Sequence, residues 1–218
     1  MIVKSNHSTH VLQALTDLEL KTFDVASVKE MDQVFSINPD ATMFFSHPVK
    51  SVKTIAYAYE KGVRVFALDT MEELEKILDT TNHAPDLQLL IRIDPEADSD
   101  SAAFPLKEMF GMSRSKNDDY IGVLQKAREH AAKVGISFHV GSQCGEVSAY
   151  TKAIEVAADM AKESGVDIDM LDVGGGFPIE YGEGIIPSID QYIDEIQTSL
   201  KAVGWQNKPL IFEPGRGK

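Results

Sequence analysis

Leu-Asp-Val-Gly-Gly-Gly-Phe-Pro, residues 171–178, is an apolar run that ends in three consecutive glycines. The run predicts a buried strand, and the glycines remove side chains from the turn after it, so that backbone N–H groups can face an anion. A tight turn also uses glycine for its positive φ angles, so the turn alone is weak evidence for a phosphate site. It gains weight from the next predicted strand, which is followed by Glu213, Pro214, Gly215 and Arg216.

The order of apolar run, polar turn and amphipathic stretch recurs along the whole chain. We expect strands over residues 2–4, 22–26, 42–45, 63–68, 87–93, 136–140, 170–173 and 209–212. Between them we expect helices over residues 8–18, 28–37, 49–61, 71–79, 118–134, 147–164 and 188–203. The alternation predicts one α/β domain over residues 1–218, a (β/α)8 TIM barrel, with a doubly wound sheet as the alternative.

The ends of the expected helices have their own signals. Ser27 and Ser188 are expected N-caps, and Thr70 with Glu73 three residues later predicts a capping box. Glycines after the expected helices are predicted to stand just past the last helical turn. They are Gly62, Gly135, Gly165 and Gly204.

The composition is that of a globular protein with 218 residues, of which 43% are hydrophobic and 25% charged. The formal net charge of -13 argues against nucleic-acid binding, which needs a basic face, and would steer a cationic substrate favourably. A single cysteine, Cys144, excludes an internal disulfide framework and fits a reducing compartment. No apolar run has the length of a membrane span. We expect a cytoplasmic protein that binds neither nucleic acid nor a membrane.

One connection is unusually long. Residues 94–117 begin with acidic and small side chains and later contain the pair Phe110 and Gly111. Long loops in small domains are usually lids or disordered segments. We expect a mobile lid, with plain disorder as the alternative.

Charged and polar residues stand at the ends of the expected strands. They are Lys4, Asp24, Arg92, His139, Ser142 and Glu213. In barrels of this kind the chemistry lies at the carboxyl ends of the strands, and the loops after strands seven and eight often hold a phosphate. Each residue alone has a structural explanation, such as a solvated lysine or a buried ion pair. Together they would line one mouth of the barrel.

The joint pattern predicts pyridoxal phosphate as the cofactor. The turn of Gly174, Gly175 and Gly176 and the guanidinium of Arg216 suit a phosphate dianion. A desolvated lysine such as Lys4 can form a Schiff base with an aldehyde. Glu213 can keep a pyridine nitrogen protonated, so that the ring accepts electrons from the substrate.

Two other kinds of active site have weaker support. His139, Asp172 and Glu213 could converge on a metal, and His7 and His10 are three residues apart, but closely set ligands are missing. We therefore expect no metal. The sequence also lacks the Gly-x-Ser-x-Gly signature of a nucleophile elbow.

The sequence resembles the fold type III pyridoxal-phosphate decarboxylases, which include ornithine, diaminopimelate and biosynthetic arginine decarboxylases. The resemblance covers nearly the whole chain and is closest to the short bacterial ornithine decarboxylases. The blocks that carry it are residues 3–6 (Val-Lys-Ser-Asn), 23–27, 92–93, 138–142, 174–178 and 213–216.

This resemblance implies a role for each site residue. Lys4 would bind the aldehyde of the cofactor, His139 would stack on its ring, and these two are the predicted catalytic residues. Glu213 would pair with the ring nitrogen, and Asp24 and Arg92 would line the reactive edge. Ser142, Gly176, Gly215 and Arg216 would hold the phosphate. Further predicted cofactor-binding residues are Gly174, Gly175 and Pro214.

The resemblance also implies a reaction. Family members decarboxylate amino acids as homodimers, which makes ornithine, converted to putrescine in polyamine biosynthesis, the first expected substrate. Lysine, arginine and diaminopimelate are further possibilities. The alternatives are a pyridoxal-phosphate-binding barrel without catalysis and an inactive decarboxylase fragment.

The chain departs from the family in three places. The C-terminal β-domain of the family does not occur in these residues, so we expect a truncated form whose activity alone is doubtful. The strand and helix that usually precede the lysine block do not occur in them either. His47 stands where many relatives have asparagine.

Overall fold

In the part of the chain that the structure describes, seven parallel strands form one sheet in the order β1, β2, β3, β4, β6, β8 and β9. The structure is a computed structural model that describes residues 2–96, 102–104, 110–115, 118–180 and 186–215. The strands of the sheet are Thr22–Asp24 (β1), Thr42–Phe45 (β2), Val65–Leu68 (β3), Gln88–Arg92 (β4), Lys133–Ser137 (β6), Met170–Asp172 (β8) and Leu210–Ile211 (β9).

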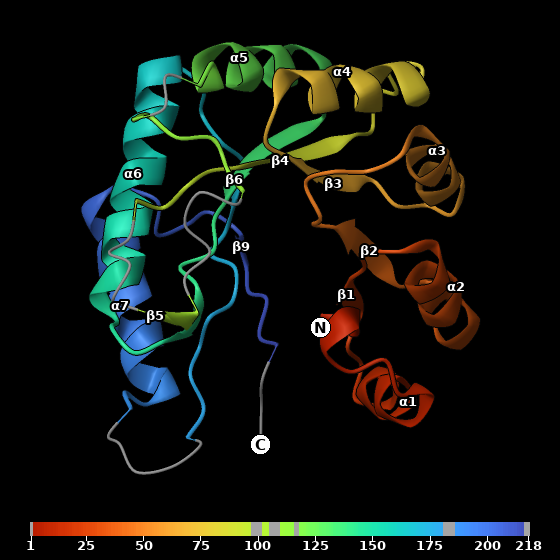
Figure 1. Ribbon diagram of the computed structural model, residues 1–218, viewed down its shortest axis with the longest axis horizontal. Helices are drawn as coiled ribbons and strands as arrows, with labels where there is room; N and C mark the ends of the chain where they lie inside the picture. The colour runs from red at the N-terminus through yellow and green to blue at the C-terminus, as the bar shows by residue number, and fades with distance from the viewer. Residues whose placement is uncertain (1, 97–101, 105–109, 116–117, 181–185, 216–218) are drawn as a thin grey trace.

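Helices alternate with these strands and lie outside the curled sheet (Figure 1). They are Thr9–Asp17 (α1), Val28–Ile37 (α2), Val52–Glu60 (α3), Met71–Thr80 (α4), Tyr120–His130 (α5), Ser148–Ser164 (α6) and Ile189–Ala202 (α7). Each strand pairs in parallel with the next strand of the sheet, as in the pairing of Phe23 with Met43. The predicted barrel class is confirmed by this arrangement of parallel strands inside and helices outside.

The first expected strand is shorter than predicted. Ile2 makes one parallel bridge to Asp24, and the chain then enters a 3-10 turn over Val3–Ser5. The turn forms because the N–H groups of Ser5 and Asn6 donate back to the carbonyl oxygens of Ile2 and Val3, at 3.3 and 3.1 Å. Among the described residues, β9 therefore pairs with β8 alone.

The predicted helix starts agree with the structure. The hydroxyl oxygen of Ser27 accepts from the Glu30 N–H at 3.3 Å, and Ser188 forms a full capping box with Gln191. Thr70 accepts from the Glu73 N–H at 3.1 Å. The Glu73 carboxylate, however, pairs with lysines. The expected reciprocal capping at this helix is thus only half present.

The predicted role of Gly135 is wrong. The helix expected over residues 118–134 ends at His130, and Gly135 lies inside β6, where it pairs with Leu90 and Met170. A Cβ at Gly135 would stand 2.7 Å from the Met170 carbonyl oxygen and 2.8 Å from the Leu90 side chain. The close packing of three strands, rather than a helix end, requires glycine here. The other predicted glycines follow their helices with positive φ angles, as expected; they are Gly62, Gly165 and Gly204.

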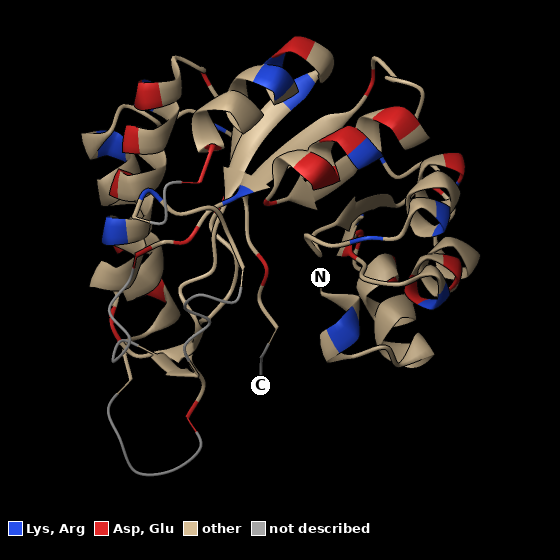
Figure 2. Cartoon of the chain, turned by 45° about the horizontal axis from the view of Figure 1, so that its top comes forward, with Lys and Arg blue, Asp and Glu red and all other residues tan. Residues whose placement is uncertain are grey.

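The core lies between the sheet and the helices. It is built of buried apolar side chains from both layers, among them Phe23, Phe66 and Ile136. Figure 2 shows the charged residues mainly on the helices, while the strands are almost free of them. No helix among the described residues is long and apolar enough to cross a membrane.

The long connection over residues 94–117 is partly ordered. Ala102–Phe104 (β5) pairs in antiparallel fashion with Ser142–Cys144 (β7), and Met112 makes a parallel bridge to Ile93. The Gly111 N–H donates to a carboxylate oxygen of Asp69 at 3.0 Å. The expected lid falls partly on residues 97–101, 105–109 and 116–117, which lie outside the described residues.

We expect Gly135→Ala to lower the free energy of unfolding by about 1–3 kcal/mol, because the added methyl group overpacks the contact between β6 and β8. Urea denaturation would measure the change. Gly145→Ala is the control, because a Cβ at Gly145 meets nothing within 4 Å. Its effect should stay within about 0.5 kcal/mol. Equal stability of the two variants would contradict the packing described for β6.

Candidate functional site

The carboxyl ends of the strands bring six ionisable side chains to one mouth of the sheet. They are Asp24 (β1), Asp69 (after β3), Arg92 (β4), His139 (after β6), Asp172 (β8) and Glu213 (after β9). The Arg92 guanidinium interacts electrostatically with all four carboxylates of this set. Residues from across the whole sheet thus form one electrostatic cluster.

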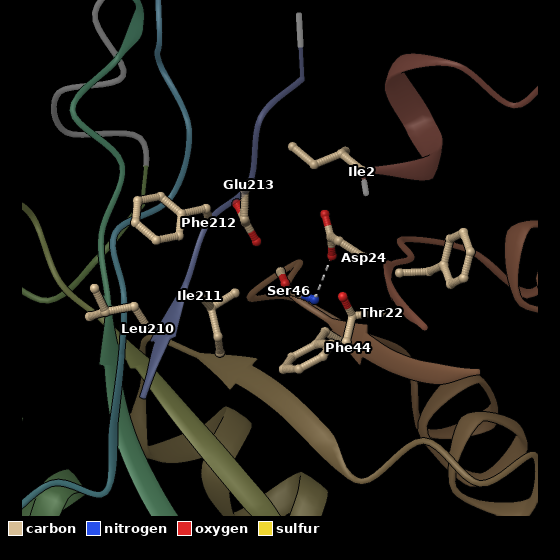
Figure 3. Close-up of a pocket in the computed structure, with 10 residues that line it drawn as sticks. Ile2, Thr22, Asp24, Phe44, Ser46, Leu210, Ile211, Phe212 and Glu213 are labelled. Carbon is tan, nitrogen blue, oxygen red and sulfur yellow. Dashed lines mark hydrogen bonds between the residues drawn. The ribbon is translucent and has the colours of Figure 1, made fainter. Parts of the chain in front are cut away.

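A cavity of about 210 Å³ lies between the first two strands and β9. Figure 3 shows Asp24 and Glu213 facing each other across this cavity, and Ile2 is a further lining residue. The remaining lining is largely apolar; it consists of Thr22, Phe23, Phe44, Ser46, Leu210, Ile211 and Phe212. The two carboxyl groups are therefore the main polar groups facing one confined space.

Asp24 is held in a nearly dry position. Its side chain accepts a hydrogen bond from the Ser46 N–H at 3.3 Å, and only 8% of the residue is exposed. Burial, with a further contribution from the charge of Glu213, raises the pKa of Asp24 to about 7. The ammonium of Lys4 and the Ser46 hydrogen bonds oppose this rise. Asp24 can consequently gain or lose a proton near neutral pH.

Asp172 is buried more deeply, at 2% exposure. Burial first, and then the charges of Glu213 and Asp24, raise its pKa well above the ordinary value. The Gly174 N–H donates to its carboxylate at 2.9 Å, and this bond and Arg92 act in the opposite direction. Asp172 thereby connects the end of β8 to the glycine turn.

Arg92 is largely desolvated, which lowers its pKa, while the surrounding carboxylates favour its charged form. Its guanidinium carbon lies 5.1 Å from the centre of the Phe110 ring, a cation–π contact. His47 meets the same ring edge-on at 5.8 Å between centroids. An aromatic side chain from the long connection therefore packs on the cationic centre of the site.

The glycine turn lies too close to its neighbours to carry side chains. A Cβ would stand 2.2 Å from the Phe138 carbonyl oxygen at Gly174, and 2.3 Å from the Glu213 carbonyl oxygen at Gly175. At Gly176 a Cβ would lie 2.3 Å from the carbonyl oxygen of Gly141. The turn after β8 is thus in backbone contact with the segments that follow β6 and β9.

The carbonyl groups of this turn are engaged in hydrogen bonds. Gly174 accepts from the Glu213 N–H at 2.7 Å, Gly175 from the Tyr150 hydroxyl at 2.8 Å, and Gly176 from the Cys144 N–H at 2.8 Å. The N–H groups of Gly175 and Gly176 donate to no other described residue. These two backbone donors are therefore not used by the described part of the chain.

His139 is half-buried, and the Gly141 N–H donates to its Nδ1 at 3.0 Å. Nδ1 is therefore the unprotonated nitrogen in the neutral ring. A Cβ at Gly175 would lie 3.5 Å from His139 Nε2, so the ring borders the glycine turn. The backbone after β6 fixes the orientation of the ring.

The structure brings most of the predicted site residues together. Lys4, exposed in its 3-10 turn, interacts electrostatically with Asp24. A Cβ at Gly215 would lie 3.6 Å from the side chain of Ile2, so the turn after β9 passes beside the Lys4 segment. Ser142 lies in β7, three residues beyond His139. Pro214 is exposed after Glu213.

Arg216, the predicted partner of the phosphate, lies outside the described residues. The metal alternative gains no support, because the described part of the chain contains no group of three or more His, Cys, Asp or Glu that could hold a metal ion.

Sequence reasoning overlooked two members of the site. Asp69 directly follows the last residue of β3, just as Glu213 follows the last apolar residues of β9, so the strand-end rule could have found it. Ser46 directly follows β2 and acts through its backbone N–H. A backbone contact of this kind has no side-chain signature.

Comparison with known proteins identifies one family over almost the whole chain. The family model described as "Pyridoxal-dependent decarboxylase, pyridoxal binding domain" matches residues 2–217. A lysine/ornithine decarboxylase of Selenomonas ruminantium is 31% identical over 218 residues, which cover 98% of this chain and 53% of that protein. Antizyme inhibitor 2 of Xenopus laevis is 32% identical over 228 residues, with 98% of this chain and 46% of that protein covered.

The solved structures agree with these matches. The arginine decarboxylase of Paramecium bursaria Chlorella virus superposes with a TM-score of 0.80 at 28% identity, over 98% of this chain and 56% of that one. The chain thus spans about half the length of the relatives it matches.

The pKa of Asp24 tests the geometry of the cavity without any ligand. We expect a carbon-13 NMR titration of its carboxyl group to give a pKa of about 7. Glu213→Gln should lower this pKa, because a like charge is removed. Lys4→Met should raise it, because a favourable opposite charge is removed.

The exposed Glu129 of α5 provides a control, and Glu129→Gln should leave the titration unchanged. An ordinary pKa near 4 for Asp24 in the folded wild type would contradict the burial described above.

Proposed function

The chain belongs to the pyridoxal-dependent decarboxylase family, and we propose that it is the cofactor-binding half of an enzyme that decarboxylates a basic amino acid. The observation that carries the proposal is the glycine turn. Gly175 in this turn borders both Glu213 and His139, because a Cβ there would stand 2.3 Å from the Glu213 carbonyl oxygen and 3.5 Å from His139 Nε2. Donors for a phosphate, an imidazole and a carboxylate therefore meet at one place.

The residues present fit pyridoxal phosphate. The N–H groups of Gly175 and Gly176, which donate to no other described residue, would donate to the phosphate. Glu213 would hold the pyridine nitrogen, and His139 would pack on a ring face. The cofactor, when bound, supplies an electron-accepting ring that stabilises the carbanion left by departing carbon dioxide.

Lys4 would bind the aldehyde through its amine, from a turn that directly follows Ile2, which lines the cavity. Asp24 interacts electrostatically with Lys4. Its pKa of about 7 lets the Asp24 carboxyl group hold or release a proton beside the Lys4 amine. Arg92 would face the reactive edge of the cofactor, and Phe110 keeps one side of its guanidinium away from water.

The remaining phosphate contacts are proposed by position. Ser142 lies in β7, and Pro214 and Gly215 follow Glu213 in the turn after β9. Arg216 would follow directly in sequence. Together with the glycine turn, Ser142, Gly215 and Arg216 would supply donors to the phosphate, and Pro214 would border it.

We propose ornithine, converted to putrescine, as the first substrate to test, with lysine, arginine and diaminopimelate as the others. The relatives named above include decarboxylases of lysine, ornithine and arginine. The excess of carboxylates over cations at the mouth, around Arg92, also suits a substrate with a second amino group.

The full-length protein is proposed to act in the cytoplasm as a homodimer in polyamine biosynthesis. The lone cysteine, which is buried, supports a reducing compartment. The resemblance to a family of dimeric decarboxylases supports the dimer.

A second candidate function is pyridoxal-phosphate binding without catalysis. The similarity to antizyme inhibitor 2 favours considering it, because that protein is not named as an enzyme. The blocks 174–178 and 213–216, which resemble those of decarboxylases, favour the decarboxylase.

We expect pyridoxal phosphate to produce a visible absorbance band with the protein, and borohydride to fix the cofactor on Lys4. Peptide mass spectrometry would locate the added group. Lys4→Ala should lose both the band and the adduct, whereas Lys29→Ala, at an exposed position on α2, should retain them. Attachment at another lysine, or no binding by a folded sample, would refute the proposed site.

Catalysis is tested by carbon dioxide release from ornithine, lysine, arginine and diaminopimelate in turn. We expect release from at least one of them, and its loss in Lys4→Ala. Silence with all four in a sample that binds the cofactor would favour the non-catalytic function or an inactive decarboxylase fragment.

A further inference from the structure

Lys50, between β2 and α3, is a fully buried lysine outside the residues considered so far, with 0% of its side chain exposed. Its ammonium donates to the carbonyl oxygens of His47 at 3.0 Å and Pro48 at 3.1 Å, and to that of Ala67. The Glu73 carboxylate lies 3.1 Å away and is itself almost buried. We refer to this set as the Lys50 cluster.

The Lys50 cluster joins two strand ends that supply site residues. His47 and Pro48 belong to the turn after β2, directly beyond Ser46, whose N–H donates to Asp24. Ala67 lies in β3, two residues before Asp69, which accepts from Gly111. A single ammonium group thus bonds both to the backbone that follows β2 and to the backbone of β3.

An ion pair buried in this way adds little net stability, because both charged groups have lost their contact with water. Burial lowers the pKa of Lys50 to about 8, although the negative charge of Glu73 acts in the opposite direction. Buried ion pairs can often be replaced by apolar side chains without loss of stability, whereas removal of one partner leaves an unpaired charge. A role in geometry explains the Lys50 cluster better than a role in stability.

We propose that Lys50 and Glu73 are positioning residues that hold the ends of β2 and β3, and through them Ser46 and Asp69, in the arrangement that the site requires. Lys50 bonds to both strand ends, and Glu73 holds Lys50 from the first turn of α4. Neither residue is among those that line the cavity between β1, β2 and β9. The expected effect on cofactor affinity rests on the proposed function, but the effect on the strand ends does not.

The test uses Lys50→Met in the whole chain. The amide NMR signals of Ser46 and Gly111 report on the bonds to Asp24 and Asp69 and need no ligand. We expect both signals to shift and their hydrogen exchange to accelerate. The dissociation constant for pyridoxal phosphate should rise by at least about tenfold, the effect of losing one charge-assisted hydrogen bond in the supporting layer.

Lys50→Met combined with Glu73→Gln separates position from stability. The double variant leaves no unpaired buried charge, so it should regain much of the thermal stability that Lys50→Met loses. It should still show the shifted Ser46 and Gly111 signals and the weakened cofactor binding.

Lys76→Met is the matched control. Lys76 pairs with the same Glu73 from a partly exposed position, with 30% of its side chain accessible. The ammonium of Lys76 has no hydrogen bond to a backbone carbonyl of the described residues. The control should therefore leave the Ser46 and Gly111 signals and the cofactor affinity unchanged.

Unchanged Ser46 and Gly111 signals in Lys50→Met would overturn the positioning role, as would a double variant that recovers both stability and signals. A wild type that binds no pyridoxal phosphate would instead refute the proposed function. The two amide signals would still decide the role of Lys50.

Discussion

The turn after β8 lies directly on the backbone of its neighbours, and the rest of the site depends on this contact. Any side chain at Gly174, Gly175 or Gly176 would collide with a carbonyl oxygen at 2.2–2.3 Å. Because the side chains are absent, the Glu213 N–H can bond to the turn and Tyr150 can reach it from α6. Three strand ends are joined by this contact, which sets the separation between the histidine segment and the acidic end of β9.

The electrostatics of the mouth follow from the same geometry. Strand ends that meet this closely place Asp24 and Asp172 within range of the Glu213 charge, which contributes to the raised pKa of both groups. The charge of Lys4 beside Asp24 and that of Arg92 beside Asp172 act in the opposite direction. A protonated pyridine nitrogen placed among these carboxylates would offset part of their excess negative charge.

Local signals predicted much of the fold, because many elements are delimited by short-range interactions. The cap at Ser188 is one such interaction. Prediction failed where packing decided the outcome. The apolar pattern of α5 continues beyond His130, yet the chain turns into β6 because Gly135 fits between Leu90 and Met170. The family resemblance predicted a role for each cofactor residue. The rule that active-site residues lie at the carboxyl ends of barrel strands predicted that these residues come together. Lys50 gave no signal, since a lysine in a turn is ordinarily solvated.

The curl of the sheet has a consequence for behaviour in solution. Among the described residues, β1 and β9 are the two edge strands, and each has one side without a complete ladder of backbone hydrogen bonds to another strand. Such edges are the usual starting points for strand pairing between molecules. Here Thr22 on one edge and Leu210 on the other line the same cavity. A foreign strand would have to enter that cavity to pair with them. The shape that gathers the charged residues at the mouth thus also turns the two edge strands toward each other, which leaves little room for a second molecule to pair with either one.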